Sequence, residues 1–501
     1  MSGMNLDQDL ETRINPEKNR QFAPEEFGRR LIQLKEFAIH HWPRKNGLRI
    51  SVVGTNGKGS VSHYLSSLLL SSGIQTGVYS SPHLEHYSER IQIEGKSGQT
   101  DLNHAYLALR SSFMDWDADL WHSLSYFELL TLLAIELFQA SSIPVQIYEA
   151  GLGGRLDASG LCDPDIVIVT RIALDHTKLL GNTREAIFQE KLGIAGKSAR
   201  YIFLMEERYE NLARNLLERA GHEDPSANSK EKAVPAQVHC FEAGGSARQN
   251  YLQENFAFAK WILTQLADPL MSSQIQDAGS SPSLRLLKEK IQSFRFSDVP
   301  APPGRMLDYR GYGIRWMYDS GHNPASLFTV LKSFSTPPLL VLGILPDRSY
   351  AHFLRVARWL GVSVIFCIER PGLADIPEEV RYYSLEDSRE AETYGTPGLA
   401  TGELSESTAS KNPVPGTEAD GHFPSRVKPS VYRLSASLSA SQLRKTLLDC
   451  AHSKQYGHSR NASKDKKQSV QTEEEVTILF TGSYRIYDLF LEILGGDIVH
   501  A

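Results

Sequence analysis

A chain of 501 residues predicts two or three domains, and its formal net charge of −6 excludes a general attraction to nucleic acid or to an anionic membrane. Its composition, 41% hydrophobic and 22% charged, is that of an ordinary soluble globular protein. Four cysteines without a C-x-x-C pair exclude a disulfide framework and a cysteine zinc site, and no signal peptide or membrane-spanning run stands out. We therefore expect a cytoplasmic protein.

Short β-rich runs alternate with helical patterns through most of the chain, which predicts parallel strands in an α/β fold. The first strand, Leu48 to Val53, leads directly into the glycine-rich stretch Gly54-Thr-Asn-Gly-Lys-Gly-Ser60. A helix follows this stretch and ends at Ser71-Ser-Gly73. Further strands are expected at Ile74–Tyr79, Val145–Glu149 and Ile166–Thr170, and a helix is expected to begin near Thr183.

Prolines in Val299-Pro-Ala-Pro-Pro-Gly304 mark an expected domain boundary, so we divide the chain into domains 1–299 and 300–501. A second α/β series follows the boundary, with strands expected at Ile314–Tyr318, Leu339–Gly343, Val362–Ile368 and Val476–Thr481. Residues 220–235 are polar and indicate a surface loop. Segments 386–430 and 452–475 contain too few apolar residues to offset the cost of ordering, and both are expected to be disordered or loosely held.

The stretch Val52 to Ser60 departs from the usual phosphate-loop pattern. Val52 stands where a glycine is expected, and Gly59 separates Lys58 from Ser60. The stretch still offers a strand end, backbone N–H groups, a lysine and a helix N-terminus, which are the physical requirements for binding phosphate. Taken alone, it is either a nucleotide loop or a glycine-rich structural turn.

Polar clusters follow three of the expected strands, namely Ser80–Leu84, Glu149–Asp157 and Leu174–Gly181. Open α/β sheets bind ligands at the carboxyl ends of their strands, so these clusters should converge on the glycine-rich stretch. A hydroxyl, a carboxylate and an imidazole gathered there would suit Mg²⁺ bridging the phosphates of ATP.

With these motifs the chain resembles the folylpolyglutamate synthase and dihydrofolate synthase family of the Mur ligase superfamily. The resemblance runs from roughly Phe27 to Leu494, apart from the two polar segments. Its motifs are Gly54–Ser60, Ser81-Pro-His83, Glu149–Asp157, Leu174-Asp-His-Thr177, Glu190-Lys-Leu-Gly-Ile194, Pro303-Gly-Arg305 and Asp319-Ser-Gly-His-Asn-Pro324.

The resemblance implies an α/β fold with an N-terminal P-loop ATPase-type parallel-sheet domain and a smaller, Rossmann-like C-terminal glutamate-ligase domain. It implies an ATP-dependent ligase that adds L-glutamate to dihydropteroate, tetrahydrofolate or both through an acyl phosphate. The expected partners are small molecules, with no nucleic acid and no membrane, and the expected state is a monomer. Another Mur-type amino-acid ligase, or a nucleotide-binding regulator without ligase activity, remains an alternative.

The resemblance also implies roles for individual residues. Lys58, Lys191 and His322 match catalytic positions, and Lys191 would carry a carbamate that holds a second metal ion. Mg²⁺ would be held by Ser81, Glu149 and His176. Contacts to ATP are expected from Gly54, Thr55, Asn56, Gly57, Lys58, Gly59, Ser60, Asn255, Arg305 and Asp319. The pterin-bearing acid is expected near Ser125, Tyr126, Phe127, Glu128, Leu156, Asp157 and Ala158.

Several of these residues have ordinary structural alternatives. Ser81 could start a turn, His176 could be structural, Phe127 could belong to the core, and Arg305 could form a salt bridge at the domain boundary. By default Lys191 would be a solvated charge, Asn255 an exposed helix residue and Asp319 a helix cap. Departures from the family pattern at Asp157-Ala-Ser-Gly160 and Asp347-Arg-Ser349 leave the preferred acceptor and the glutamate chain length open.

Overall fold

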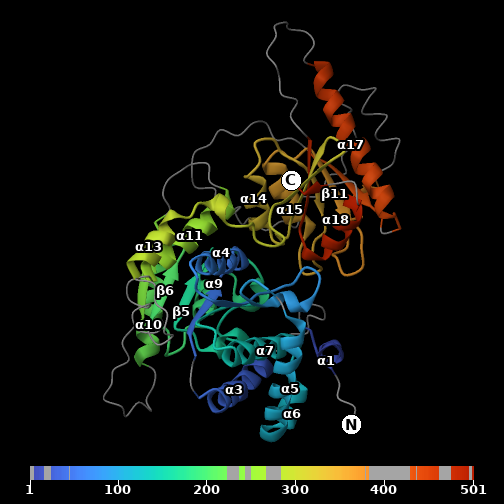
Figure 1. The fold of residues 1–501 in the computed structure, drawn as a ribbon. Helices are drawn as coiled ribbons and strands as arrows, with labels where there is room; N and C mark the ends of the chain where they lie inside the picture. The colour runs from blue at the N-terminus through green and yellow to red at the C-terminus, as the bar shows by residue number, and fades with distance from the viewer. Residues whose placement is uncertain are drawn as a thin grey trace. The chain divides into compact units, whose positions relative to one another are not determined.

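The computed structural model describes residues 5–15, 24–43, 46–96, 98–222, 236–242, 250–266, 284–378, 380–382, 429–435, 437–461, 476–495 and 499–500. The chain divides into two compact units, Met1–Pro302 and Pro303–Ala501, each built around its own sheet (Figure 1). None of the helices in the described ranges is long and apolar enough to cross a membrane.

The sheet of the first unit has seven strands in the order β3-β2-β4-β1-β5-β6-β7. Every neighbouring pair is parallel except β2 and β3. The parallel strands therefore all end at one edge, and the loops that leave β2, β4, β1 and β5 lie next to one another there. The strands are β1 (Leu48–Val53), β2 (Thr76–Tyr79), β3 (Ile91–Ile93), β4 (Val145–Glu149), β5 (Ile166–Val169), β6 (Tyr201–Leu204) and β7 (Gln237–Cys240).

Helices cover both faces of this sheet, so its central strands read as nearly continuous apolar runs. On one face, Ile50 and Val52 of β1 pack with the helix that follows the glycine-rich stretch, and on the other Val53 packs against a second helical layer. The first layer consists of α4 (Lys58–Ser71), α11 (Tyr251–Leu266) and α13 (Leu284–Ser293). The opposite face carries α3 (Pro24–His41), α5 (Gln99–Trp116), α6 (Ala118–Ser123), α7 (Tyr126–Ala140), α9 (Arg184–Leu192) and α10 (Glu210–His222).

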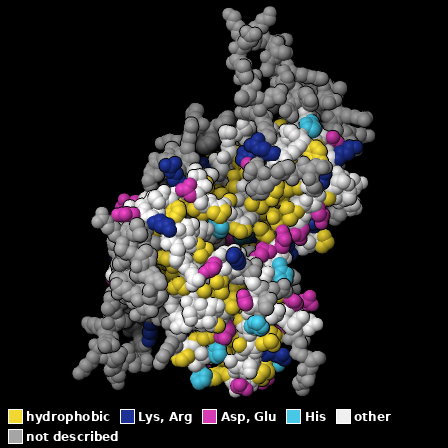
Figure 2. Space-filling view, viewed as in Figure 1, with side chains coloured by type: hydrophobic (Ala, Val, Ile, Leu, Met, Phe, Trp, Pro, Cys, Tyr) yellow, Lys and Arg dark blue, Asp and Glu magenta, His cyan; other side chains and the backbone are white. Residues whose placement is uncertain are grey.

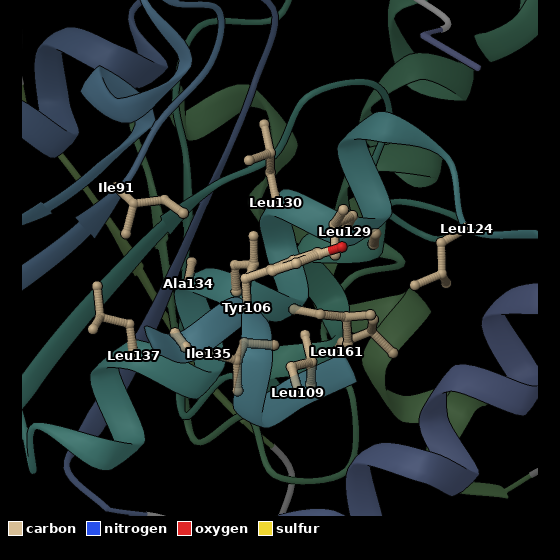
Figure 3. Packing of buried hydrophobic residues seen from close by; sticks show 14 of the residues in the cluster. Ile91, Tyr106, Leu109, Leu124, Leu129, Leu130, Ala134, Ile135, Leu137 and Leu161 are labelled. Atoms are coloured by element: carbon tan, nitrogen blue, oxygen red, sulfur yellow. The ribbon is translucent and has the colours of Figure 1, made fainter. Parts of the chain in front are cut away.

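The largest cluster of buried apolar side chains surrounds α7. Tyr106 of α5 lies in it among Leu109, Leu129 and Ile135 (Figure 3). The Tyr106 hydroxyl donates a hydrogen bond to Asp9 of the short helix α1 (Leu6–Thr12), at 2.8 Å. This hydrogen bond gives the buried hydroxyl a partner and ties α1 to the cluster.

The second unit has an eight-stranded sheet in the order β12-β13-β11-β10-β14-β9-β8-β15. Strands β12 to β9 in this order are parallel, whereas β8 is antiparallel to β9 and to β15. The strands are β8 (Leu307–Gly311), β9 (Ile314–Asp319), β10 (Leu339–Leu342), β11 (Val364–Ile368), β12 (Arg381–Tyr382), β13 (Ser430–Leu434), β14 (Val476–Thr481) and β15 (Val499–His500). Its helices are α14 (Pro324–Leu331), α15 (Tyr350–Trp359), α17 (Ala440–Asn461) and α18 (Tyr487–Leu494).

The predicted α/β class and its strands are confirmed, with small changes at the ends. Strand β2 begins at Thr76 and β11 at Val364, each two residues later than predicted. The helix α9 begins at Arg184, with Thr183 as its N-cap. The first residue of a strand is set by its hydrogen bonds to the neighbouring strand. Composition alone therefore places a strand end only to within one or two residues.

Of the two alternatives predicted for residues 452–475, disorder does not hold at the start of the segment, because α17 continues to Asn461. Leu443, Leu447 and Ala451 are buried on the first turns of this helix, and an anchored helix propagates into polar sequence at little cost. Helix α10 continues to His222, inside the segment 220–235 that was predicted as a loop, and β13 begins at Ser430, the last residue of segment 386–430. The remaining parts of these three predicted segments lie outside the described residues.

Charged side chains of both signs are mixed on the surface. On the face drawn in Figure 2, the described Lys and Arg side chains stand singly or in small groups among Asp and Glu.

Candidate functional site

The glycine-rich stretch forms a tight loop between β1 and α4. Gly54 and Gly57 have φ of +147° and +91°, and a Cβ on Gly54 would lie 1.9 Å from Thr170 Oγ1. The backbone N–H groups of Thr55 and Asn56 donate to the carbonyl of Arg171, at 2.8 and 3.2 Å. The loop is therefore fastened to the segment that follows β5.

These two hydrogen bonds to Arg171 determine which backbone amides of the loop can bind an anion. The Thr55 and Asn56 N–H groups are directed to Arg171, so the amides suited to phosphate are those of the first turn of α4, which begins at Lys58. A helix cannot pair its first N–H groups internally, and its dipole favours negative charge at this end. Ser60, in the same turn, is buried.

Glu149 ends β4, directly beside the loop. Its Cα is paired with that of Val52 in the β1–β4 register, and its side chain is buried. The backbone N–H of Ser81 donates to Glu149 Oε2 at 3.2 Å, and a Cβ on Gly59 would lie 3.3 Å from the same oxygen. Two of the three expected metal ligands, Ser81 and Glu149, are therefore together at the phosphate loop.

His176 follows β5, the strand on the other side of β1. It is the N-cap of the short helix α8 (Thr177–Leu180) and has a φ of +47°. Its Nε2 lies 3.8 Å from Oδ1 of Asp175, which is buried. The strand order places His176 at the same edge of the sheet as Ser81 and Glu149.

Lys191 is buried near the end of α9, so its reading as a solvated charge is wrong. Burial lowers the pKa of Lys191 to about 7, and repulsion from Lys58 acts in the same direction, while Asp157 and Glu190 act against it. The turn after β4 covers this position, because a Cβ on Gly154 would lie only 2.2 Å from the Lys191 carbonyl. A lysine in this environment is partly neutral near pH 7.

Asn255 is also buried, so the exposed-residue reading is wrong here too. It lies in the first turns of α11, and a Cβ on Gly57 would come 2.9 Å from its Oδ1. Its neighbour Glu254 forms an ion pair with Arg171. The sequence analysis did not identify Arg171 or Glu254 as site residues. The position of Arg171 just after the apolar strand β5 could have indicated that it lies at the site.

The expected pterin residues at 125–128 form the start of α7. Ser125 is its N-cap, and Ser125 and Glu128 form a reciprocal capping box. The buried Glu128 carboxylate also accepts hydrogen bonds from Arg30 Nε, at 2.8 Å to each oxygen. Tyr126 lies beneath the guanidinium of Arg90, 5.4 Å from ring centroid to Cζ. Ser125 and Glu128 therefore have structural partners.

Phe127 and the residues 156–158 line the turn after β4. A Cβ on Gly151 would come 2.8 Å from the half-buried Phe127 ring, and Leu156 packs against the same apolar cluster. Asp157 accepts hydrogen bonds from the Ser159 backbone N–H and hydroxyl, at 2.9 and 2.6 Å, and caps the 3-10 turn that begins at Ala158. Burial raises the pKa of Asp157, against these hydrogen bonds.

In the second unit, Asp319 ends β9 and holds the loop that follows it. Its buried carboxylate accepts hydrogen bonds from the N–H groups of Gly321 and Met306, at 2.8 and 3.1 Å, and lies 3.5 Å from Arg305 Nη1. The N-cap of α14 is Asn323, so the reading of Asp319 as a helix cap is wrong. His322 lies in this loop, with Nδ1 3.4 Å from the Ser320 carbonyl.

The chain has two α/β units, the first with a glycine-rich loop at the carboxyl edge of a parallel sheet, and solved structures of folate enzymes share this fold. *Mycobacterium tuberculosis* folylpolyglutamate synthase complexed with ADP superimposes with a TM-score of 0.61 at 20% identity, over 97% of each chain. *Escherichia coli* FolC in complex with DHPP and ADP gives a TM-score of 0.58 at 22% identity, over 96% of this chain and 95% of that one. At these identities the superpositions establish the fold.

Curated sequence relatives have the same enzyme names as these structures. *Haemophilus influenzae* dihydrofolate synthase/folylpolyglutamate synthase is 46% identical over 145 residues, which is 29% of this chain and 32% of the relative, so the match spans about a third of that protein. *Lacticaseibacillus casei* folylpolyglutamate synthase is 26% identical over 381 residues, 69% of this chain and 82% of the relative. No protein-family model matches the chain. The chain is therefore similar to folylpolyglutamate synthases and dihydrofolate synthases, closely over about a third of their length and more distantly over most of it.

Proposed function

We propose that this chain is an ATP-dependent ligase that joins L-glutamate to dihydropteroate, to tetrahydrofolate or to both. The observation that carries the proposal is the buried Glu149 carboxylate, held by Ser81 against the backbone of a phosphate loop. A similar solved structure, a bifunctional folylpolyglutamate synthase/dihydrofolate synthase, has Mn, AMPPNP and L-glutamate bound, and the E. coli neighbour binds DHPP and ADP. These ligands indicate what this chain would take.

The first unit would bind ATP through the loop and the first turn of α4. Lys58 neutralises charge on the β- and γ-phosphates, and Asn255 adds an amide beside Gly57. The donor set suits a divalent cation such as Mg²⁺, since Glu149 and Ser81 offer oxygen ligands and His176 an imidazole. The described residues hold no cluster of three or more His, Cys, Asp or Glu side chains suited to a metal, so phosphate oxygens and water would complete the shell. When bound, the cation neutralises phosphate charge.

The chemistry joins a carboxylate to an amine in two steps. A carboxylate oxygen of the pterin-bearing acid attacks the γ-phosphorus, the bond from that phosphorus to the bridging oxygen breaks, and ADP leaves with its electron pair. The glutamate nitrogen then attacks the acyl carbon, phosphate departs, and the nitrogen loses a proton. Lys58 stabilises the transferred phosphoryl group, so its contribution is mainly electrostatic.

Lys191 would carry a carbamate. Its neutral amine attacks CO₂, an N–C bond forms, one C=O electron pair moves onto oxygen, and the nitrogen releases a proton to water. Burial supports this proposal, because a pKa of about 7 leaves a reactive amine near neutral pH. Intact-mass measurement and ¹³C NMR with labelled CO₂ test the modification, and a Lys191 that stays unmodified at saturating CO₂ would contradict it.

The acid substrate would lie near the turn after β4, where Phe127 and Leu156 offer apolar surface. The resemblance also implies substrate contacts from Tyr126, Asp157 and Ala158. Ser125 and Glu128 would act indirectly, because their capping box forms the start of α7. The second unit would act as the glutamate-ligase domain, with Arg305 and Asp319 as ATP contacts and His322 orienting phosphate. The Asp319 hydrogen bonds that hold this loop support that assignment.

The decisive experiment follows ADP release by the purified full chain with ATP and Mg²⁺. We expect release only when the pterin-bearing acid and L-glutamate are both present, with one amide product formed per ADP. Muramyl precursors and other amino acids serve as competing substrates. Turnover with a muramyl acceptor alone would indicate another Mur-type ligase, and ATP binding without product under all conditions would indicate a regulator.

A further inference from the structure

We infer that the ion pair between Arg171 and Glu254 holds Asn255 against the phosphate loop, which makes Arg171 and Glu254 positioning residues for the nucleotide. This inference rests on the proposed function, because it assigns the pair to the ATP site. The two residues are separated by 83 positions in the sequence and come from different elements.

Arg171 is attached to the loop through its backbone. It follows β5, and its carbonyl accepts the Thr55 and Asn56 N–H groups, so that Asn56 and Arg171 form an antiparallel bridge. The Thr55 hydroxyl adds a hydrogen bond to the Ala173 carbonyl at 3.1 Å. A movement of Arg171 is therefore passed to the loop itself.

Glu254 is attached to Asn255 through the helix. Both lie in the first turns of α11, and Asn250 and Gln253 close this helix end by reciprocal hydrogen bonds of 2.9 and 3.1 Å. The Glu254 carboxylate fixes the turn on one side by pairing with Arg171. On the other side, Asn255 lies against Gly57, where a Cβ would come 2.9 Å from its Oδ1.

Packing holds the body of α11 independently of this ion pair. Phe256 makes an edge contact with Tyr64 of α4, with ring centroids 5.6 Å apart, and both rings are buried. The side chains of Arg171 and Glu254 remain 41% and 23% exposed. Exposed ion pairs contribute little to the free energy of unfolding, so we expect this one to affect geometry at the loop more than stability.

A second carboxylate, that of Glu206, also interacts with Arg171. Glu206 accepts a hydrogen bond from the Ile172 N–H at 2.8 Å and also pairs with Arg208. Arg171 therefore faces carboxylates from both Glu254 and Glu206. Removing the charge of Arg171 would change its interactions with both carboxylates, whereas Glu254→Gln removes only the ion pair with Glu254.

The test is calorimetric titration of the full chain with Mg·ADP. We expect Glu254→Gln to weaken Mg·ADP binding about 5-fold, with the KM for ATP raised and the KM for the pterin-bearing acid unchanged. Arg171→Lys should retain most of the affinity, since it keeps a cation facing both carboxylates. The matched control is Glu210→Gln, which breaks the ion pair with Arg214 in the first turn of α10 and should leave affinity unchanged.

Each other outcome has a definite meaning. Unchanged affinity in Glu254→Gln, with a wild type that binds and turns over, overturns this inference alone. A loss that is matched by a fall in melting temperature and is equally large in Arg171→Lys assigns the pair a purely structural role and also overturns it. A wild type that binds no Mg·ADP overturns both the inference and the proposed function.

Discussion

The Glu149 carboxylate lies against the backbone of Gly59, so closely that a Cβ on that glycine would come 3.3 Å from Oε2. The contact arises because β4 pairs with β1, which brings the end of one strand beside the loop leaving the other. Glycine at position 59 thus keeps open the space between a carboxylate and the start of α4, where phosphate and a cation would meet.

Gly59→Ala should separate activity from stability. Gly59 is in the first turn of α4 and does not have a positive φ, so alanine fits its backbone and should stabilise the helix by about 0.5–1 kcal/mol. The added methyl group displaces Glu149, and we expect ADP release to fall by about 100-fold. The control is Gly28→Ala in α3, whose Cβ would make only an ordinary 3.7 Å contact. Full activity in Gly59→Ala would contradict this account.

Lys58→Ala should abolish turnover while leaving the fold intact. Lys58 begins α4 at the edge of the sheet, and removing one electrostatic clamp on a transferred phosphoryl group costs about 3–4 kcal/mol of barrier. Single-turnover ADP formation and circular dichroism measure the two effects, with the exposed Lys197→Ala as control. Near-normal turnover in Lys58→Ala would remove the phosphate-loop assignment.

Lys191 should make stability depend on pH in a defined window. Its pKa is about 7 in the folded chain and 10.5 ordinarily, so between these values the unfolded chain binds one more proton. Between pH 7 and 10.5, the free energy of unfolding of the wild type should therefore rise with pH relative to that of Lys191→Met, by up to about 1.4 kcal/mol per pH unit. Below pH 7 the curves of the two proteins against pH should run parallel. Urea unfolding in CO₂-free buffer tests this, and parallel curves from pH 7 to 10 would contradict it.

Glu128→Gln should destabilise the chain. It leaves the buried Arg30 guanidinium without its anionic partner, and breaking a buried ion pair in this way costs about 3–5 kcal/mol. Ser125→Ala removes only the N-cap hydroxyl and should cost about 1 kcal/mol. Both are measured by urea unfolding. If Glu128→Gln unfolds like wild type and instead raises the KM for the pterin-bearing acid, its role is in substrate binding.

Much of the fold could be predicted because short sequence patterns indicate the individual strands, turns and helices. The apolar run of β1, the glycines after it and the periodic helix α4 each point to the same strand–loop–helix unit. The end of α17 was not predictable, because its polar residues follow a helix that is anchored by buried Leu443 and Leu447. The composition of a segment does not show whether a helix is already formed before it. A polar segment can continue such a helix, because extending a helix costs less than starting one.

The sequence by itself determined the order of strands and helices, the position of the phosphate loop and the expected convergence of Ser81, Glu149 and His176. These features depend on short-range patterns and on the rule that parallel strands end at one edge. Only the tertiary structure decided that Lys191 and Asn255 are buried and that Arg171 meets Glu254. A residue on a helix faces solvent or protein according to what packs against it, and those partners come from distant parts of the chain.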